Sequence, residues 1–335
     1  MKKVTINDVA RLAGVSIKSV SRVVNREANV RAEMRAKVEA VIDQLGYKPN
    51  PAARSLAAGR SLNIAILFDN PSPNYTMKVQ EGAYAACREA NYQLILEHIE
   101  TSAATVNEML DAMFAHRRVD GVVVTPPATD CEAVLDALER HHLPYVRIAP
   151  QARADRSPAI LSNDSQAMGE VVQFLWGLGH RSFGFVGGPP THGASAWRRE
   201  GFLAALAERG VEPADVMMAD GDFTFASGIG AGLRLLRRKD GPTAIFAAND
   251  DMAAGVFAAA AQLSIRIPEM LSVVGFDDSW IAKSVWPELT TVRQPIVEMA
   301  YEAVVMLAHR EHRTGPARVH KCTFIVRGST GPTHQ

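Results

Sequence analysis

The hydrophobic residues of the first 46 positions fall into three runs, each with the spacing of one helical face. The three apolar faces are Ile6, Val9, Ala10 and Ala13; Val20, Val23 and Val24; and Ala36, Val38, Val41, Ile42 and Leu45. Thr5 and Asp8 have the spacing of a capping box, and Ser16 is placed to cap the second helix. Gly14 supplies a turn between the first two helices, and Gly46 ends the third. Three amphipathic helices of this length have enough apolar surface for one small core.

The polar face of the second helix indicates nucleic-acid binding. Ile17, Lys18, Ser21 and Arg22 lie outside the apolar stripe, so basic and hydroxyl groups project outward together. Two short helices around a glycine turn, the second with such a face, form a unit that fits the major groove of DNA. The alternative is an ordinary helical hairpin at the start of a domain. The third helix and the segment that follows it argue against this alternative.

Residues 47–60 predict a further, very short helix. Asn50 is a helix cap, Pro51 suits the first helical position, and Gly59 is a stop signal. A helix of one or two turns is marginal alone. We therefore expect it to form only when something else holds it.

These residues, and the order of the segments after them, resemble the lactose/galactose repressor family of bacterial transcription regulators over nearly the whole chain. The resemblance implies that Ile17, Lys18 and Arg22 read operator bases. It also implies that the short helix is a hinge helix, which pairs with its twin in a homodimer and pushes Leu56 into the minor groove. The implied DNA-binding residues are Thr5, Ser16, Ile17, Lys18, Ser21, Arg22, Asn25, Asn50, Ala53, Leu56 and Ala57. Arg31 departs from the family, which usually has a Ser or Thr cap there, at a cost of ~1 kcal/mol.

The charge of the chain is unevenly distributed. Lysine and arginine together equal aspartate and glutamate in number, 36 of each. Residues 1–60 carry 12 basic and 5 acidic side chains, a net charge of +7, whereas the remaining 275 residues carry 24 and 31, a net charge of −7. A solvated basic face is the alternative, and its coincidence with the capped helices disfavours it. We expect phosphate contacts at this basic segment, and therefore an affinity that falls steeply with salt.

From residue 61 onward, apolar strands alternate with amphipathic helices. We expect strands at 62–68, 93–96, 121–125, 145–148, 159–161, 183–186, 244–247, 272–276 and 323–326. This alternation predicts an α/β fold, in which helices cover both faces of parallel sheets and a ligand crevice lies at the strand tips.

The family resemblance implies that these elements form two lobes like those of periplasmic sugar-binding proteins. Residues 1–60 are expected to form the helix-turn-helix head and hinge helix, and 61–335 the effector-binding and dimerisation domain. The expected boundaries are about 61–160 plus 291–322 for lobe 1 and about 161–290 plus 323–329 for lobe 2.

Polar residues directly after the predicted strands are candidates for holding a small molecule between the lobes. A sugar needs paired partners for its hydroxyl groups and an apolar surface for its ring. Family members hold effector groups at the positions of Arg198, Asn249, Asp277 and Gln294, and often have an aromatic residue at the position of Phe223. The expected effector-binding residues are Asn70, Tyr75, Arg147, Arg198, Phe223, Asn249, Asp277 and Gln294.

Several of these candidates have a structural alternative. Asn249 and Asp250 could cap the helix that follows them. One of the pair Asp277 and Asp278 could be structural, and Phe223 could be plain core.

The end of the fourth predicted strand departs from the family. Several sugar-responsive relatives have an Asp at the position of Ala149, whose side chain cannot form a hydrogen bond. The effector therefore need not be the galactoside of a relative. Arg147 could supply the missing polarity, or it could be a solvated or helix-facing arginine.

Several other classes of protein are disfavoured. The first residues do not resemble a secretion signal, and no apolar stretch reaches the ~18 residues that a membrane-spanning helix needs. Cys87, Cys131 and Cys322 are widely spaced, as in a reduced compartment. We expect a bacterial cytoplasmic protein associated with the nucleoid. The C-terminal tail has no heptad repeat that would join dimers into tetramers, so a homodimer is expected.

No sequence motif indicates catalysis. His-Glu-x-x-His, paired-cysteine and Gly-x-Ser-x-Gly motifs are absent, so we expect no enzyme, no metal and no cofactor. The alternatives are a sugar-binding receptor and a glycoside-acting enzyme with a DNA anchor. The basic helical head argues against a receptor without DNA function. An enzyme would convert its bound glycoside to product, which a pure binding protein would not do.

Overall fold

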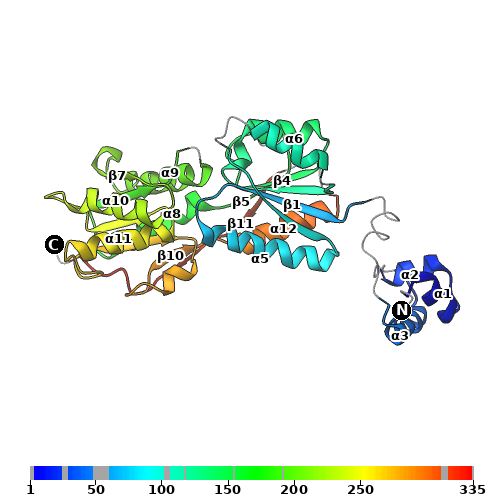
Figure 1. Ribbon diagram of the computed structural model, residues 1–335. Coiled ribbons are helices and arrows are strands. Elements are labelled where there is room, and N and C mark those ends of the chain that lie inside the picture. The colour runs from blue at the N-terminus through cyan, green and yellow to red at the C-terminus, as the bar shows by residue number, and fades with distance from the viewer. Residues whose placement is uncertain are drawn as a thin grey trace. The chain divides into compact units, whose positions relative to one another are not determined.

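The computed structural model describes residues 4–24, 29–47, 60–101, 106–116, 118–153, 155–190, 192–310 and 316–333. The chain divides into two compact units, Met1–Leu62 and Asn63–Gln335 (Figure 1). Each unit has its own hydrophobic core.

The first unit contains three helices, α1 (Ile6–Ala13), α2 (Ile17–Val24) and α3 (Ala32–Leu45). Their buried side chains are Val9, Ala10, Ala13, Val20, Val23, Val38 and Val41. The Asp8 carboxylate accepts hydrogen bonds from the backbone N–H (3.0 Å) and the hydroxyl (2.8 Å) of Thr5. Gly14 and Gly46 follow α1 and α3 with φ of 62° and 58°, a left-handed conformation that glycine adopts without strain. The spacing of apolar residues in the sequence thus predicted the faces that pack together.

The second unit contains two six-stranded sheets. The first sheet has the order β11-β5-β4-β3-β1-β2 and is parallel throughout. Its strands are β1 (Asn63–Phe68), β2 (Gln93–His98), β3 (Gly121–Val124), β4 (Tyr145–Ile148), β5 (Ala159–Ser162) and β11 (Arg318–His320). The second sheet has the order β12-β10-β9-β8-β6-β7, and its β10–β12 pair is antiparallel. Its strands are β6 (Phe183–Gly187), β7 (Met217–Asp220), β8 (Ala244–Ala247), β9 (Ser272–Phe276), β10 (Thr290–Arg293) and β12 (Thr323–Ile325).

Helices cover both sheets in packed pairs. The helices of the first sheet are α5 (Pro73–Ala90), α6 (Val106–His116), α7 (Glu132–Arg140) and α12 (Ile296–Ala308). Those of the second are α8 (Asp164–Gly177), α9 (Gly193–Ala207), α10 (Phe225–Leu236) and α11 (Asp250–Gln262). Helix α5 packs on α12, α6 on α7, α8 on α9, and α10 on α11. Short 3₁₀ helices lie at Ala128–Asp130, Pro213–Asp215 and Trp280–Lys283.

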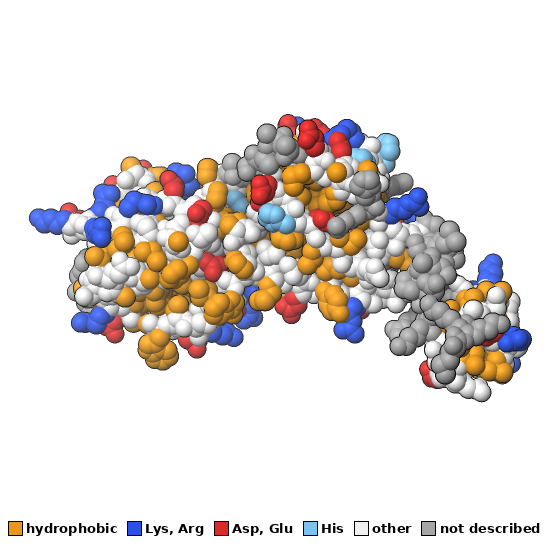
Figure 2. Space-filling view, in the orientation of Figure 1, with side chains coloured by type: hydrophobic (Ala, Val, Ile, Leu, Met, Phe, Trp, Pro, Cys, Tyr) orange, Lys and Arg blue, Asp and Glu red, His pale blue; other side chains and the backbone are white. Residues whose placement is uncertain are grey.

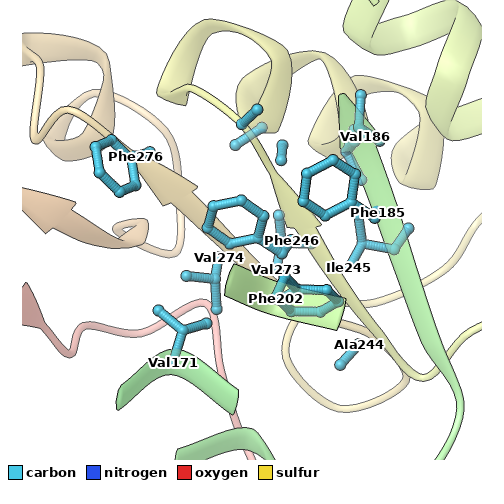
Figure 3. Close-up of a cluster of buried hydrophobic side chains, with 14 of the residues drawn as sticks. Val171, Phe185, Val186, Phe202, Ala244, Ile245, Phe246, Val273, Val274 and Phe276 are labelled. Carbon is cyan, nitrogen blue, oxygen red and sulfur yellow. The ribbon is translucent and has the colours of Figure 1, made fainter. Parts of the chain in front are cut away.

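The alternation of side chains along β1 shows how the first sheet is covered. Ile64 and Ile66 pack in the cluster formed with α5 and α12, whereas Ala65 and Leu67 pack in a second cluster with α6 and α7. Successive side chains of a strand point to opposite faces of the sheet, so both faces are buried. The second sheet has an aromatic core, in which Phe185, Phe202 and Phe246 lie with ring centroids 5.5 to 5.6 Å apart (Figure 3).

We call the first sheet with its helices lobe 1 and the second sheet with its helices lobe 2. The chain crosses between them after Ser162, after Arg293 and after His320. The return to lobe 1 follows β10, which ends at Arg293, and the sequence expected this return at about 291. The crossovers are tied together, because the Asn163 side chain accepts a hydrogen bond from the backbone N–H of Cys322 at 2.6 Å.

The sequence did not predict strands β7, β10 and β11. Strand β11 is three residues long, and both it and β7 lie at sheet edges, where each exposes two of its side chains. Strand β10 is buried but contains two threonines and an arginine, so it has no apolar run. Among the described residues, no helix is long and apolar enough to span a bilayer.

Candidate functional site

The first unit presents the side chains that the sequence predicted for DNA binding. Ser16, Ile17 and Lys18 are exposed at the start of α2, and Ile17 is 51% exposed although it is apolar. The Ser16 hydroxyl accepts from the N–H of Ser19 at 3.1 Å and so caps α2. Thr5 is also exposed. The start of α2 therefore presents a basic side chain, a hydroxyl group and an apolar side chain on one accessible surface.

Of the remaining predicted DNA-binding residues, the structure describes two. Ser21 and Arg22 are half-buried, and the Arg22 guanidinium donates to the carbonyl of Asn29 at 3.1 Å. Asn25, Asn50, Ala53, Leu56 and Ala57 lie outside the described residues. The side chain of Arg31, at the N-cap of α3, forms no capping hydrogen bond, in agreement with its departure from the family pattern.

In the second unit, a small cavity lies between the two lobes. It is lined by Asn70, Ser72, Tyr75, Pro126, Ala149, His192, Ala194, Arg198, Phe223, Asn249, Asp277 and Gln294. Seven of the eight predicted effector residues are in this set, and they come from sequence positions 70 to 294. The cavity volume is about 20 Å³. Because this is room for roughly one water molecule, the lobes have to part before a larger ligand can enter.

Arg198 is the central charged residue of the cavity. Its Nε donates to Asp164 Oδ2 at 2.8 Å, and its Nη1 donates to the carbonyl of Ala248 at 2.5 Å. Its guanidinium carbon lies 3.6 Å from the centroid of the Phe276 ring. Its Nη2 donates to Gln294 Oε1 at 3.3 Å. Arg198 is 3% exposed, so its charge is held by a buried ion pair and not by water.

Gln294 links this arginine to the crossovers between the lobes. Its Nε2 donates to the Ser162 hydroxyl at 2.7 Å, and that hydroxyl in turn donates to Asp164. Ser162 ends β5 and Gln294 follows β10, so both lie where the chain changes lobes. A ligand that moves Arg198 or Gln294 therefore acts on the segments that set the angle between the lobes.

Asp277 offers free hydrogen-bond acceptors to the cavity. Its side chain accepts no hydrogen bond from the described residues, and the nearest cation is Arg198 Nη2, 3.7 Å from Oδ1. Burial raises the pKa of Asp277 to about 7, although Arg198 and Lys78 act in the opposite direction. Its neighbour Asp278 pairs instead with Arg293 and Arg327. Asp277 is thus the binding candidate of the pair, and Asp278 the structural one.

Asn249 caps α11, as one of the two sequence alternatives expected, and it also lines the cavity. Its Oδ1 accepts from the N–H of Met252 at 2.9 Å, which caps α11, and its Nδ2 donates to the carbonyl of Phe223 at 3.0 Å. Phe223 has φ of 68°, an unusual value for a residue with a side chain. Asn249 therefore holds the backbone that presents the Phe223 ring to the cavity.

Asp250 is structural. Its carboxylate accepts from the N–H of Ser279 at 2.7 Å and from the Thr291 hydroxyl at 2.6 Å, and the residue is fully buried. Burial raises its pKa to about 8, and the nearby charge of Asp277 acts in the same direction.

The structure does not bring Arg147 into the cavity, and it is not solvated. It faces the 3₁₀ helix Ala128–Asp130, where its Nη1 donates to the carbonyl of Thr129 at 3.4 Å and lies 3.8 Å from Asp130 Oδ1. It is 0% exposed, and its guanidinium donates to Ser157 Oγ (2.9 Å) and to the carbonyls of Ala152 (2.9 Å) and Arg153. These contacts hold the loop after β4, where Ala149 contributes the apolar cavity wall. Arg147 shapes the site only through this loop.

Direct hydrogen bonds join the lobes beside the cavity. Asp251 of α11 accepts from the Ser72 hydroxyl and from Asn74 Nδ2, both at 2.8 Å and both from the start of α5. Lys78 Nζ donates to the carbonyls of Asp277 and Asp278 at 2.7 and 2.9 Å. We call these contacts the interlobe clamp. The clamp links lobe 1 directly to lobe 2.

Five lining residues lie outside the predicted effector set. The sequence had singled out Ala149 for its lack of side-chain polarity, and it missed Ser72, Pro126, His192 and Ala194. Ser72 was detectable as the N-cap before Pro73, since its side chain accepts from the N–H of Tyr75. His192 precedes α9, and neither its spacing nor its neighbours distinguish it from a surface histidine. No group of three or more potential metal ligands occurs in the described parts of the chain.

Two family models match the chain, one for each unit. Residues 5–50 match "Bacterial regulatory proteins, lacI family", and residues 172–330 match "Periplasmic binding protein-like domain". The chain is 33% identical to "Catabolite control protein A" of Priestia megaterium, over 91% of both chains. It is 32% identical to "Ribose operon repressor" of Escherichia coli, over 91% of this chain and 92% of the relative.

Solved structures show the same architecture. A "transcriptional regulator CelR-cellobiose complex" aligns with a TM-score of 0.73 and 27% identity, over 98% of this chain and all of the other. A lac repressor dimer bound to operator and the anti-inducer ONPF aligns with a TM-score of 0.76 and 25% identity, with the same coverage. The relative from Escherichia coli is named as a repressor, in agreement with the regulator, and not the enzyme, that the sequence predicted. A helix-turn-helix head, a two-lobed α/β unit and these relatives together show that the chain belongs to the lacI family of bacterial transcriptional regulators.

Proposed function

We propose that the chain is an operator-binding repressor whose operator affinity is switched by a neutral sugar or glycoside held between the lobes. The observation that carries this proposal is the set of cavity residues, which combines polar side chains, among them the Asp277 carboxylate that is unbonded within the described residues, with the rings of Tyr75 and Phe223. A sugar presents hydroxyl groups to the former and a ring face to the latter. The cellobiose bound by a structural relative supports this ligand class.

The charges of the cavity favour a neutral ligand. The positive charge of Arg198 is matched by Asp164 at 2.8 Å, which leaves the described cavity lining with no unmatched cation for a carboxylate or phosphate. Asp277 contributes acceptors suited to hydroxyl donors.

The first test is a thermal-shift screen with ribose, cellobiose, other glycosides and purine bases. A ligand that binds only the folded state raises the melting temperature, as RT ln(1 + [L]/Kd) requires. We expect one or more sugars to raise it and to do so less for Asp277→Ala. A shift with purine bases alone would contradict the sugar class, and no shift with any compound would contradict a small-molecule switch of these classes.

At the operator, we propose that Ile17, Lys18 and Arg22 read bases in the major groove, while Ser16, Ser21 and Asn25 lie near phosphates. Thr5 is a further DNA-binding residue. The hinge residues Asn50, Ala53, Leu56 and Ala57 would form a helix paired with its twin in a homodimer and insert Leu56 into the minor groove. Leu56→Ala should weaken operator binding and leave sugar binding unchanged. Equal operator affinity would contradict the wedge.

Homodimer formation is supported by the apolar surface of lobe 2. Trp280 is 60% exposed, Trp286 is 88% exposed and Phe225 is 44% exposed. Figure 2 shows one face on which hydrophobic side chains gather over this lobe. Such a patch marks an interaction surface in a soluble protein. We place the protein in the bacterial cytoplasm, associated with the nucleoid through its operator.

A further inference from the structure

The orientation of the Asn70 amide determines what it offers to its neighbours. The backbone N–H of Ser72, which can only donate, lies 2.9 Å from Asn70 Oδ1. The oxygen of the amide therefore faces Ser72, and the NH₂ group faces the other way. Asn70 Nδ2 lies 3.3 Å from Nε2 of His192, across the gap between the lobes.

This contact fixes the proton on the His192 ring. Since Asn70 Nδ2 is a donor, Nε2 of His192 has to be the acceptor and carries no hydrogen. Burial, followed by the nearby charge of Arg198, lowers the pKa of His192 to about 3, so the ring is neutral near pH 7. A neutral imidazole keeps one hydrogen, which leaves it on Nδ1.

That Nδ1–H group has no acceptor among the described residues. His192 is 5% exposed, and its Nδ1 is one of the buried side-chain polar atoms for which this part of the chain supplies no hydrogen-bond partner. The others belong to Thr129, Ser195 and Ser279, and none of these three residues lines the cavity. Buried donors without an acceptor are rare, because each costs desolvation free energy. An unpaired donor beside a ligand cavity therefore indicates that a bound ligand supplies the acceptor.

The Phe223 ring is the competing partner that the described geometry offers. The His192 and Phe223 rings meet edge to face, with centroids 4.9 Å apart. An N–H···π contact is weaker than a hydrogen bond to oxygen and would give way to it.

We propose that His192 is a specificity-determining residue that donates Nδ1–H to an oxygen of the effector while Nε2 accepts from Asn70. The proposal rests on the proposed sugar site and assigns it a donor that compensates for the missing side-chain polarity at Ala149. One ring thereby touches both the ligand and lobe 1, although it belongs to lobe 2. Binding of the effector polarises the same imidazole that bonds to Asn70, so ligand recognition strengthens the contact between the lobes.

The first test determines the tautomer without any ligand. Long-range ¹H–¹⁵N correlation spectra of the ¹⁵N-labelled full chain separate protonated from unprotonated ring nitrogens. The His192 signals are assigned by their loss in His192→Asn. We expect hydrogen on Nδ1 and none on Nε2 at pH 7. Hydrogen on Nε2, or on both nitrogens, would overturn the proposal.

The second test uses two variants that each keep one nitrogen position. The amide introduced by His192→Asn overlaps the Nδ1 position, whereas the longer amide introduced by His192→Gln overlaps the Nε2 position. We expect His192→Asn to bind the best sugar of the ribose, cellobiose and glycoside panel within about threefold of the unaltered chain. His192→Gln should lose roughly tenfold, the value of one hydrogen bond.

The two possible failures are distinguishable. If no sugar of the panel binds the unaltered chain, the sugar class fails, while the tautomer spectrum still decides the state of His192. If a sugar binds and His192→Gln binds it as tightly as the unaltered chain, only the role of His192 is overturned. Melting temperatures of both variants within about 3 °C of the unaltered chain confirm that they fold.

Discussion

The two units of this chain place their functional residues in opposite environments. At the start of α2, Ser16, Ile17 and Lys18 are neighbours in sequence and are exposed to solvent. In the cavity, Asn70, Arg198 and Gln294 are far apart in sequence and are brought together by strand ends and crossovers. A surface made by one helix can be changed without changing the fold, whereas a buried polar site is part of the fold that forms it. Substitutions in the cavity should therefore change the free energy of unfolding as well as function, whereas substitutions at the start of α2 should change function alone.

The largest difference is expected between Arg198→Met and Lys18→Ala. Removing Arg198 leaves Asp164 buried without its partner, which should lower the free energy of unfolding by about 3–5 kcal/mol. Removing the exposed Lys18 should change it by less than about 0.5 kcal/mol. Denaturant unfolding measures both free energies, and operator titrations should show weaker binding by Lys18→Ala despite its unchanged stability. Equal stability of Arg198→Met and the unaltered chain would contradict the buried ion pair.

The same contrast explains which parts of the fold and of the site could be predicted from the sequence. The head depends on local signals, such as the caps at Thr5 and Ser16, and its helices followed from apolar spacing. In the cavity, the family resemblance and the positions of the strand ends identified Arg198, Asn249 and Asp277. The same criteria wrongly included Arg147, which also lies near a strand end but is buried against a loop outside the cavity. His192 and the Asp251 contacts depend on how the lobes meet, and a linear sequence carries no signal for this.

A smaller effect is expected from Asp250→Asn, which imitates the protonated form of this residue. The folded pKa of Asp250 is raised to about 8, so the folded chain holds a proton that the unfolded chain releases above its ordinary pKa near 4. Stability should therefore fall as pH rises from about 4 to about 8, since the unfolded state binds fewer protons in that window. Relative to Asp250→Asn, the unaltered chain should lose about 3–4 kcal/mol between pH 5 and pH 8.

Parallel denaturant titrations of the two chains at several pH values measure this difference. Taking the difference removes the contributions of all other titrating groups. A difference that does not change between pH 5 and pH 8 would show that Asp250 is ionised throughout the range.

The smallest effect concerns the interlobe clamp. The double substitution Ser72→Ala and Asn74→Ala removes both hydrogen bonds to Asp251 and should ease the parting of the lobes. The association rate of the best sugar should rise by roughly 5- to 30-fold, because the two lost hydrogen bonds together contribute about 1–2 kcal/mol to the closed arrangement. Stopped-flow fluorescence measures the rate.

Ser165→Ala is the matched control for the clamp. Its hydroxyl donates to the carbonyl of Trp197 at 3.1 Å, and both residues belong to lobe 2. Its association rate should equal that of the unaltered chain. If the control and the double variant behave alike, the clamp does not govern closure.

The most direct test of a switch shared by the two units is the operator affinity measured with and without a saturating sugar, for the unaltered chain and for Asp277→Ala. Fluorescence anisotropy at fixed salt gives both dissociation constants. We expect the sugar to change the operator dissociation constant of the unaltered chain by roughly 5- to 150-fold. Asp277→Ala should have the same sugar-free operator affinity and show no change with the sugar. A sugar that binds the unaltered chain tightly and leaves its operator affinity unchanged would contradict the coupling between the cavity and the head.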